Sequence, residues 1–429
     1  MSKRASFHLL KEYDVPPLLI KSVWKDHDLV DIFINEHYFQ KIAKSISLDE
    51  VPKNTRVIDG VEKAIIPPFY NAHTHAAMTL LRGYADDMSL FKWLSEYIWP
   101  LEAKLTREDV YWGSRLAILE MIKSGTVFFS DMYWNREETI RAVIEMGVRA
   151  TIGVTFAENL MSPKSIEDNF DFLEKNAACH ERIQLAVMPH AVYTVGDVLW
   201  RRCAETAQRL GLVLHTHLAE TTEEVENCIQ KTGKTPVQYL DSLGVLNQNV
   251  VLAHAIHLTP EDIDILQKRD VTLVHNPSSN MKLSSGKMNI SALMKAGIPI
   301  ALGTDGASSN NNLDMREEMK FAALLAKVDG GPELLSADEV FHMATVQGSR
   351  AYQVNAGLIE EGKLADAILL DLNNERLIPN HHLVSNWVYA ADARCIDKVI
   401  CHGQILMENK SVENEIEILE RVKKFAAKN

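Results

Sequence analysis

The feature that most constrains the fold is an alternation of short apolar runs with amphipathic stretches between about residues 66 and 355. Val127–Asp131 is an apolar run, residues 136–146 have helical periodicity, and Arg149–Val154 is apolar again. Similar runs lie at 184–188, 213–217, 250–254, 271–275 and 300–305, and an earlier one ends at His73. About eight strands, most followed by a helix, predict an α/β fold of the (β/α)8 TIM-like barrel type.

Polar side chains close several of these runs. His73 and His75 alternate with one small residue, so they would project from the same face at the end of an extended strand. His217 and Asp305 close two later runs, and the strand ends of a barrel meet at one mouth. Three imidazoles and one carboxylate suit a divalent ion such as zinc or iron(II), with one position left for water. Alternatively, His217 is a core histidine and Asp305 caps the next helix.

Two further residues could move protons beside such an ion. Glu220 lies three residues after His217, just beyond the strand end, where it could reach a water activated by the metal. A carboxylate at a helix N-terminus is also favoured by the helix dipole, and the two roles are compatible. His254 closes the run at 250–254 and could stabilise the charge that develops during attack.

Charge and cysteine usage limit the partners and the compartment. The net charge is -13 and basic residues form no cluster, which argues against nucleic acid and anionic membranes as partners. The five cysteines are scattered, and no apolar run approaches the roughly 18 residues needed to span a bilayer. Residues 1–14 do not have the pattern of a signal peptide, so we expect a cytoplasmic protein.

The strand-end residues, together with Val274–Leu283 and Gly303–Asn311, resemble the amidohydrolase superfamily, and most closely its 5′-methylthioadenosine/S-adenosylhomocysteine deaminase branch. The resemblance covers nearly the whole chain. It implies a barrel catalytic domain at residues 66–359 and a small β-sandwich domain formed by residues 1–65 and 360–429 together. It also implies hydrolytic deamination of an adenine nucleoside, in which a hydroxide adds to the amino-bearing carbon and ammonia leaves.

The resemblance also implies a role for individual residues of this chain. One metal ion, with zinc expected and iron(II) or manganese(II) as alternatives, would be held by His73, His75, His217 and Asp305. Binuclear relatives use a carboxylated lysine at the end of the fourth strand, where this chain has Met188–Ala191, so one ion is expected. Glu220, His254 and Asp305 would carry the proton transfers.

Substrate residues are also implied by the resemblance. Trp93 and Glu102 match positions that hold the ribose, and His190 and Glu220 would contact the purine. Alternatively, Trp93 packs a helix and Glu102 is solvated. Where relatives offer arginines to the homocysteine carboxylate, this chain has only Lys164, so we expect adenosine or 5′-methylthioadenosine to be preferred over S-adenosylhomocysteine.

Two other functions remain open at this stage. A related aminohydrolase or chlorohydrolase would use the same chemistry on another N-heterocycle, such as guanine, a pterin or a triazine. A non-catalytic scaffold built on the same barrel would have no need to keep the ligand set. The expected partner is a small-molecule nucleoside, and the resemblance also allows a homo-oligomer.

Overall fold

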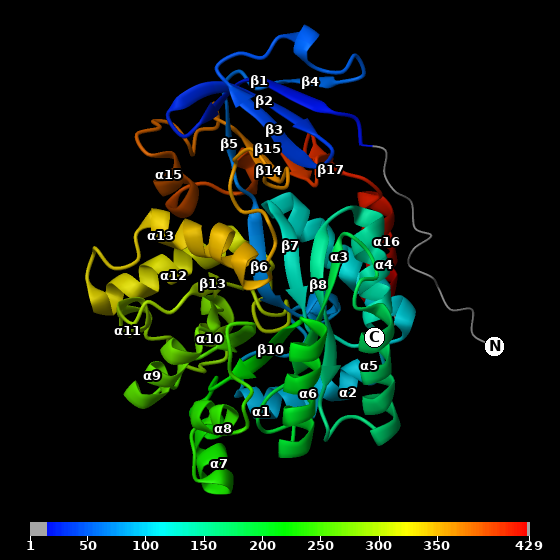
Figure 1. Ribbon diagram of the computed structural model, residues 1–429, viewed down its shortest axis with the longest axis vertical. Helices are drawn as coiled ribbons and strands as arrows, with labels where there is room; N and C mark the ends of the chain where they lie inside the picture. The colour runs from blue at the N-terminus through cyan, green and yellow to red at the C-terminus, as the bar shows by residue number, and fades with distance from the viewer. Residues whose placement is uncertain (1–14, 427–429) are drawn as a thin grey trace, which may run out of the picture.

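The computed structural model describes residues 15–426, and its largest part is a ring of eight parallel strands (Figure 1). These are β6 (Phe69–Thr74), β7 (Thr126–Asp131), β8 (Arg149–Phe156), β9 (Ile183–Pro189), β10 (Val213–Leu218), β11 (Val250–His254), β12 (Thr272–His275) and β13 (Ile300–Leu302). Each strand pairs with the next along the chain. The predicted α/β barrel is confirmed. The expectations for residues 1–14 lie outside the described part of the chain.

Helices follow the strands and cover the outside of the ring (Figure 1). They are α3 (Arg107–Ser124), α4 (Arg136–Met146), α5 (Pro163–Asn176), α6 (Asp197–Leu210), α7 (Thr222–Thr232), α8 (Pro236–Ser242), α9 (Pro260–Arg269), α10 (Pro277–Lys282), α11 (Ile290–Lys295), α12 (Met315–Gly330), α13 (Ala337–His342) and α14 (Gly348–Ala351). Every residue of β6, β7, β8, β10 and β11 is buried. Strands covered on both faces read as unbroken apolar runs, which explains why the sequence pattern was so clear.

Between β6 and α3 the chain makes an insertion over the mouth of the ring. It contains η3 (Ala76–Leu81), α1 (Leu90–Lys92), the π-helical η4 (Trp93–Ile98) and α2 (Trp99–Glu102). Helix α3 then begins at a capping box, in which Thr106 accepts the N–H of Asp109 and the Asp109 carboxylate accepts the N–H of Thr106. It ends at Gly125, whose φ of 93° is a left-handed conformation that favours glycine.

The seam between the first and last strands is held by side chains and loop backbone. Asn71 Nδ2 donates to Thr304 Oγ1 at 2.7 Å, and Thr304 N donates to Asn71 Oδ1 at 3.1 Å. Asp305 N donates to His73 O at 3.0 Å. Gly303 permits this approach, because a Cβ there would lie 2.9 Å from His73 N. Strand β13 ends at Leu302. Asp305 was predicted to close this strand, but it lies in the loop that follows.

The two terminal segments form a second, mixed sheet above the barrel (Figure 1). It contains β1 (Leu18–Lys25), β2 (Asp28–Asn35), β3 (Tyr38–Ala43), β4 (Arg56–Asp59), β5 (Lys63–Ile66), β14 (Ala367–Asp371), β15 (Ile396–Cys401), β16 (Gln404–Glu408) and β17 (Ser411–Val412). Antiparallel pairing of β5 with β14, with Ile66 opposite Ile368, joins the two halves. The sheet has its own apolar core, to which both termini contribute.

The last helix, α16 (Glu415–Ala426), lies beside the barrel helix α3 (Figure 1). Lys123 and Glu415 form an ion pair across the two helices, and the Arg421 guanidinium lies 5.1 Å from the centre of the Trp112 ring. A boundary at residue 360 assigns this helix to the terminal domain, although its contacts are with the barrel. The proposed boundaries, 1–65 with 360–429 and 66–359, stay a prediction.

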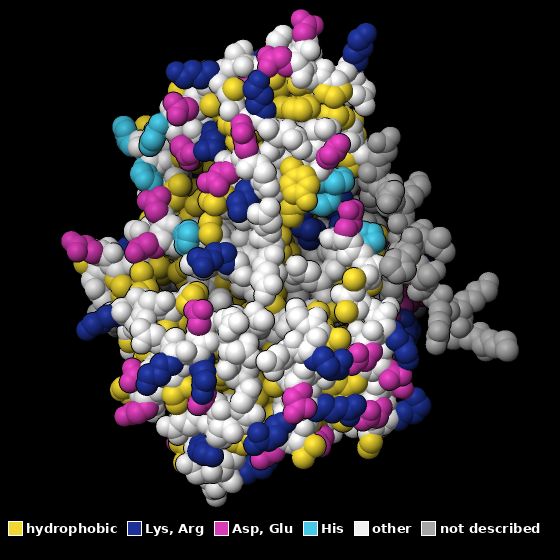
Figure 2. Space-filling view, viewed as in Figure 1, with side chains coloured by type: hydrophobic (Ala, Val, Ile, Leu, Met, Phe, Trp, Pro, Cys, Tyr) yellow, Lys and Arg dark blue, Asp and Glu magenta, His cyan; other side chains and the backbone are white. Residues whose placement is uncertain are grey.

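The surface seen in Figure 2 carries acidic and basic side chains in alternation. Several are paired, for example Arg202 with Glu167 at 2.5 Å and Lys164 with Asp168 at 2.6 Å. Among residues 15–426, none of the helices combines the length and the apolar character required to cross a bilayer.

The seam bonds generate a prediction about stability. Replacing Asn71 by Ala should lower the free energy of unfolding by about 1–3 kcal/mol, because the buried Thr304 N–H loses its acceptor. Chemical denaturation measures the change. Asn355 is exposed and donates to Gly362 O, so Asn355→Ala is the control, with an expected change below about 0.5 kcal/mol. Equal effects of the two substitutions would contradict a special role for the seam.

Candidate active site

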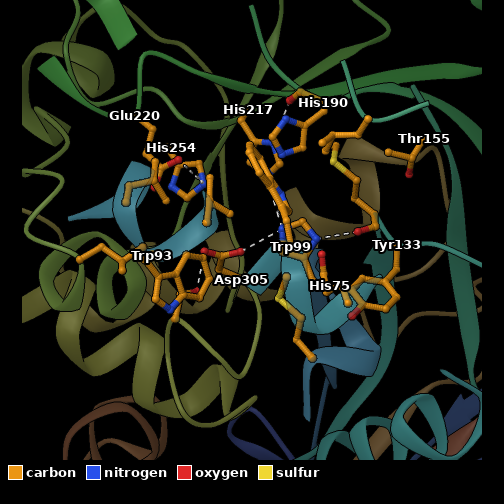
Figure 3. A pocket seen from close by; sticks show the side chains of 18 of the residues that line it. His75, Trp93, Trp99, Tyr133, Thr155, His190, His217, Glu220, His254 and Asp305 are labelled. Atoms are coloured by element: carbon orange, nitrogen blue, oxygen red, sulfur yellow. Dashed lines mark hydrogen bonds and ion pairs between the residues drawn. The ribbon is translucent and has the colours of Figure 1, made fainter. Parts of the chain in front are cut away.

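Four of the predicted residues meet at the mouth of the barrel, and Figure 3 shows three of them, His75, His217 and Asp305. His75 Nε2 and His73 Nε2 lie 3.2 and 3.4 Å from Asp305 Oδ1. His217 Nε2 lies 3.4 Å from His75 Nε2. Ligand atoms of the three histidines all fall within 4.8 Å of one another, a spacing that one metal ion could bridge. The geometry brings these side chains together, and their role as ligands stays a prediction.

The protonation pattern of the histidines suits a metal ion. His75 Nδ1 lies 2.6 Å from Met132 O, and His217 Nδ1 lies 2.8 Å from His190 O. Because a carbonyl oxygen only accepts, both Nδ1 atoms donate, so in the neutral form of each ring the Nε2 atom presents a lone pair. His73 Nε2 is buried without a hydrogen-bond partner. Asp305 Oδ1 thus lies beside the Nε2 atoms of His73 and His75, and His217 Nε2 lies beside that of His75; nitrogen and oxygen atoms of this kind are the ligands that zinc uses.

Asp305 is held so that only one of its oxygens faces this centre. Its Oδ2 accepts from Ser279 Oγ at 2.6 Å and from Ser309 Oγ at 2.9 Å. Its Oδ1 faces His73 and His75. Burial opposes protonation of His75, but the Asp305 carboxylate outweighs it and raises the pKa of His75 to about 9, whereas burial lowers the pKa of His73 to about 4.

Glu220 and His254 lie together at one side of this cluster (Figure 3). His254 Nε2 is 3.8 Å from Glu220 Oε2, and Ser285 Oγ donates to Glu220 Oε1 at 3.4 Å. His254 Nδ1 lies 2.8 Å from Asn280 Oδ1, which leaves Nε2 facing Glu220. Burial raises the pKa of Glu220, so this carboxyl is more easily protonated than one in water. The pair can accept and return a proton.

Glu224 shapes the backbone that carries Glu220. Its two carboxylate oxygens accept the N–H groups of Ala219 at 3.0 Å and of Glu220 at 2.8 Å. Ala219 has a left-handed φ of 47°, so this turn needs such support. Glu224 was not among the predicted site residues. The pattern Thr221-x-x-Glu224 is a signal for a helix cap, and Thr221 does accept the Glu224 N–H, but the pattern gives no sign of the contact with Glu220.

The pocket above the cluster is apolar and aromatic, with a few polar groups. Trp93, Glu102 and His190 all line it, as does Glu220. Trp93 is buried and its Nε1 donates to Ala85 O at 3.1 Å, so it also packs the insertion, as the alternative reading expected. His190 Nδ1 lies 3.1 Å from Thr194 Oγ1.

Glu102 is not a solvated carboxylate. Its Oε1 is buried without a well-aligned hydrogen-bond partner; burial raises its pKa, and the neighbouring side chains of Tyr133 and Trp134 lower it. Tyr133 OH and Thr155 Oγ1 line the same pocket and are likewise buried without partners. A buried oxygen without a partner is costly, so these three groups indicate a polar ligand. The sequence analysis missed Tyr133 and Thr155 because neither belongs to a recognisable motif.

Lys164 lies outside this pocket. Its side chain is 80% exposed and pairs with Asp168 on the surface. Among the described residues, those that line the pocket include no lysine and no arginine.

Residues 64–406 match the amidohydrolase family. The chain belongs to this family. A relative from Archaeoglobus fulgidus, called 5-methylthioadenosine/S-adenosylhomocysteine deaminase 1, is 47% identical over 381 residues, which cover 87% of this chain and 90% of the relative. A 5′-deoxyadenosine deaminase from Methanosphaera stadtmanae is 42% identical over 386 residues, with 89% and 90% covered.

Solved structures share the fold of this chain. A crystal structure of an adenosine deaminase from Xanthomonas campestris, described with bound zinc, superposes with a TM-score of 0.90 at 31% identity and covers 96% of this chain and 98% of that one. A guanine deaminase from C. acetobutylicum shares the fold, with a TM-score of 0.81 at 22% identity, covering 92% and 99%. The family and a zinc-bound neighbour support a divalent metal in amidohydrolases of this kind.

Glu318 on α12 ties together the two loops that hold Asp305. Its Oε2 accepts the Ser278 N–H at 3.1 Å, and its Oε1 accepts from Asn310 Nδ2 at 2.8 Å. Asn310 Nδ2 also donates to Thr304 O at 2.7 Å. Burial raises the pKa of Glu318 from 4.5 to about 8. Between these values the folded protein keeps a proton that the unfolded chain has released, so rising pH favours unfolding.

The protein should therefore lose stability relative to a Glu318→Gln variant as the pH rises from 4.5 to about 8. Within that window the free energy of unfolding of the parent minus that of the variant should fall by about 1.4 kcal/mol per pH unit, because glutamine does not titrate. Urea denaturation of both proteins at several pH values measures it. Parallel stability curves would contradict the raised pKa.

Proposed function

We propose that this chain hydrolytically deaminates an adenine nucleoside, giving the inosine analogue and ammonia. The observation that carries the proposal is the convergence of three Nε2 lone pairs and Asp305 Oδ1 beside Glu220, at the base of a pocket that also contains a buried, unpartnered Glu102 oxygen. Relatives at 42–47% identity over most of the chain are called deaminases of adenine nucleosides, which supports the same reaction here.

The proposed cofactor is one divalent ion held by His73, His75, His217 and Asp305. Zinc is favoured, because imidazole and carboxylate ligands suit it and a neighbour is described with bound zinc; iron(II) and manganese(II) are the alternatives. The chain reads Met188–Ala191 at the end of β9, with no lysine for a second ion. Such an ion supplies a nucleophile at neutral pH by lowering the pKa of water.

Side chains of the protein then transfer the protons. Glu220 accepts a proton from the attacking water and delivers it to the ring nitrogen next to the amino-bearing carbon. The new C–O bond forms, and the proton that remains on this oxygen then passes by way of Asp305 to the amino group. The C–N bond breaks as ammonia leaves, and the oxygen becomes the carbonyl oxygen of the inosine analogue. His254, with its Nδ1 fixed by Asn280, donates to or accepts from the attacking oxygen and stabilises its charge. Asp305 shares the proton transfer.

Glu102 and Trp93 are proposed to hold the ribose, and His190 the purine edge. A carboxylate accepts hydrogen bonds from two vicinal hydroxyls at once, and the unpartnered Glu102 oxygen is available for this. The absence of lysine and arginine among the described pocket residues favours a 5′ substituent that has no carboxylate. Adenosine and 5′-methylthioadenosine are therefore the proposed substrates, ahead of S-adenosylhomocysteine.

An intracellular, cytoplasmic location is part of the proposal. All five cysteines are free and buried, which suits a reducing compartment. The interspersed surface charges seen in Figure 2 and the net charge of -13 favour a small-molecule partner over nucleic acid. A homo-oligomer stays a prediction.

A comparison of nucleosides tests the reaction and the preference. Adenosine and 5′-methylthioadenosine should be turned over faster than S-adenosylhomocysteine, followed as ammonia release or as the ultraviolet change from adenine to hypoxanthine. Glu220→Gln should lower kcat by about 10²- to 10⁴-fold, because the proton carrier is lost. Leu160 lines the pocket wall, and Leu160→Arg should raise turnover of S-adenosylhomocysteine by offering its carboxylate a partner. Faster turnover of S-adenosylhomocysteine by the parent chain would refute the preference.

A second test addresses Glu102. Glu102→Gln should lower kcat/KM for adenosine by roughly 10- to 100-fold, since hydrogen bonds to a charged group contribute about 1.5–3 kcal/mol. The same variant should discriminate far less between adenosine and 2′,3′-dideoxyadenosine than the parent does. Glu158→Gln is the matched control, because Glu158 accepts the Gly196 N–H outside the pocket. Loss of nucleoside turnover with retained activity on a free base would favour the alternative heterocycle substrate.

A further inference from the structure

His73 differs from the other two imidazoles in what its Nδ1 atom meets. His75 and His217 face backbone carbonyls, which fix their tautomers, whereas His73 Nδ1 lies 2.8 Å from Nε2 of another imidazole, His215. An imidazole nitrogen can donate or accept. This contact alone therefore leaves open which nitrogen of His73 carries the proton, and a proton on Nε2 would prevent that atom from binding a metal.

The hydrogen bonds on the other side of His215 determine which nitrogen of His73 carries the proton. His215 Nδ1 lies 3.0 Å from the Tyr352 hydroxyl oxygen, and that hydroxyl lies 2.6 Å from Ala72 O. The carbonyl only accepts, so the single hydroxyl proton points to Ala72. The hydroxyl oxygen must then accept from His215 Nδ1. A neutral imidazole carries one proton, so His215 Nε2 accepts in turn from His73 Nδ1, and His73 Nε2 keeps its lone pair.

We propose that His215 and Tyr352 are positioning residues that hold His73 in the tautomer able to bind the metal. We call the set Ala72 O, Tyr352, His215 and His73 the tautomer relay. The inference rests on the proposed metal ligands. His73 and His215 are 0% exposed and Tyr352 is 1% exposed, so bulk water cannot replace a missing member. Partners that fix a metal-binding histidine in this way tune affinity for the ion.

The position of Tyr352 shows how the fold builds the relay. Tyr352 follows α14, the last helix of the barrel, and its hydroxyl bonds to β6, the first strand. Its ring also packs 5.4 Å from Phe128, centre to centre. Tyr352→Phe keeps that packing and removes only the hydroxyl, so it separates the relay from a simple role in the core.

The test is the affinity of the metal-free protein for Zn²⁺, measured by competition with a chromophoric chelator. His215→Leu should weaken binding by about 10- to 100-fold, because His73 Nδ1 loses its acceptor. Tyr352→Phe should weaken it by a smaller factor, because His215 is no longer held in one tautomer. His215→Gln should recover part of the affinity, since its side-chain oxygen can accept from His73. Tyr70→Phe removes another buried tyrosine hydroxyl, which donates to Asp366, and should leave the affinity unchanged.

Thermal unfolding of the same metal-free variants completes the test. A role in packing alone would lower the melting temperature of His215→Leu and leave the affinity of the folded protein unchanged, and that result would overturn the relay. Parent-like affinity in both His215→Leu and Tyr352→Phe would also overturn it. If His73→Ala binds Zn²⁺ as tightly as the parent, the metal set fails and the relay with it. Failure to deaminate nucleosides leaves this measurement intact, because it does not use turnover.

Discussion

Closure of the parallel ring at the seam between β6 and β13 is the constraint on which the rest of the molecule depends. His73 and His75 lie on one side of that seam and Asp305 on the other. Asn71 and Thr304 bond across it, and the Asp305 N–H donates to His73 O. Without these bonds the carboxylate would have no fixed distance from the imidazoles, and a shared centre could not form.

Hydrogen bonding prepares the site before any ligand arrives. Carbonyls fix the tautomers of His75 and His217, and two serine hydroxyls occupy the outer oxygen of Asp305. Glu224 and Glu318 support the turns that carry Glu220 and Asp305. Groups held in this way need little reorganisation during the reaction, which is the main contribution a protein makes to a metal-assisted hydrolysis.

Sequence reasoning predicted the barrel because strands buried on both faces leave long apolar runs, and it located the strand-end residues because their types are unusual there. It placed Asp305 on a strand, whereas the strand ends at Leu302 and the chain bends at Gly303 toward β6. It did not find Glu224, Ser279 or Tyr352. Their importance comes from contacts between distant elements, and each residue alone reads as a cap, a turn or a core position.

The contact of Tyr352 with Ala72 has a consequence for biosynthesis. One partner belongs to the first strand of the ring and the other follows its last helix, 280 positions later in the chain. A nascent polypeptide that has emerged from the ribosome only as far as His217 contains His73, His75 and His217 but neither Asp305 nor the Tyr352 hydroxyl proposed to orient His73. The proposed set of ligands, with the hydroxyl that orients His73, is therefore complete only after translation has passed the end of the barrel.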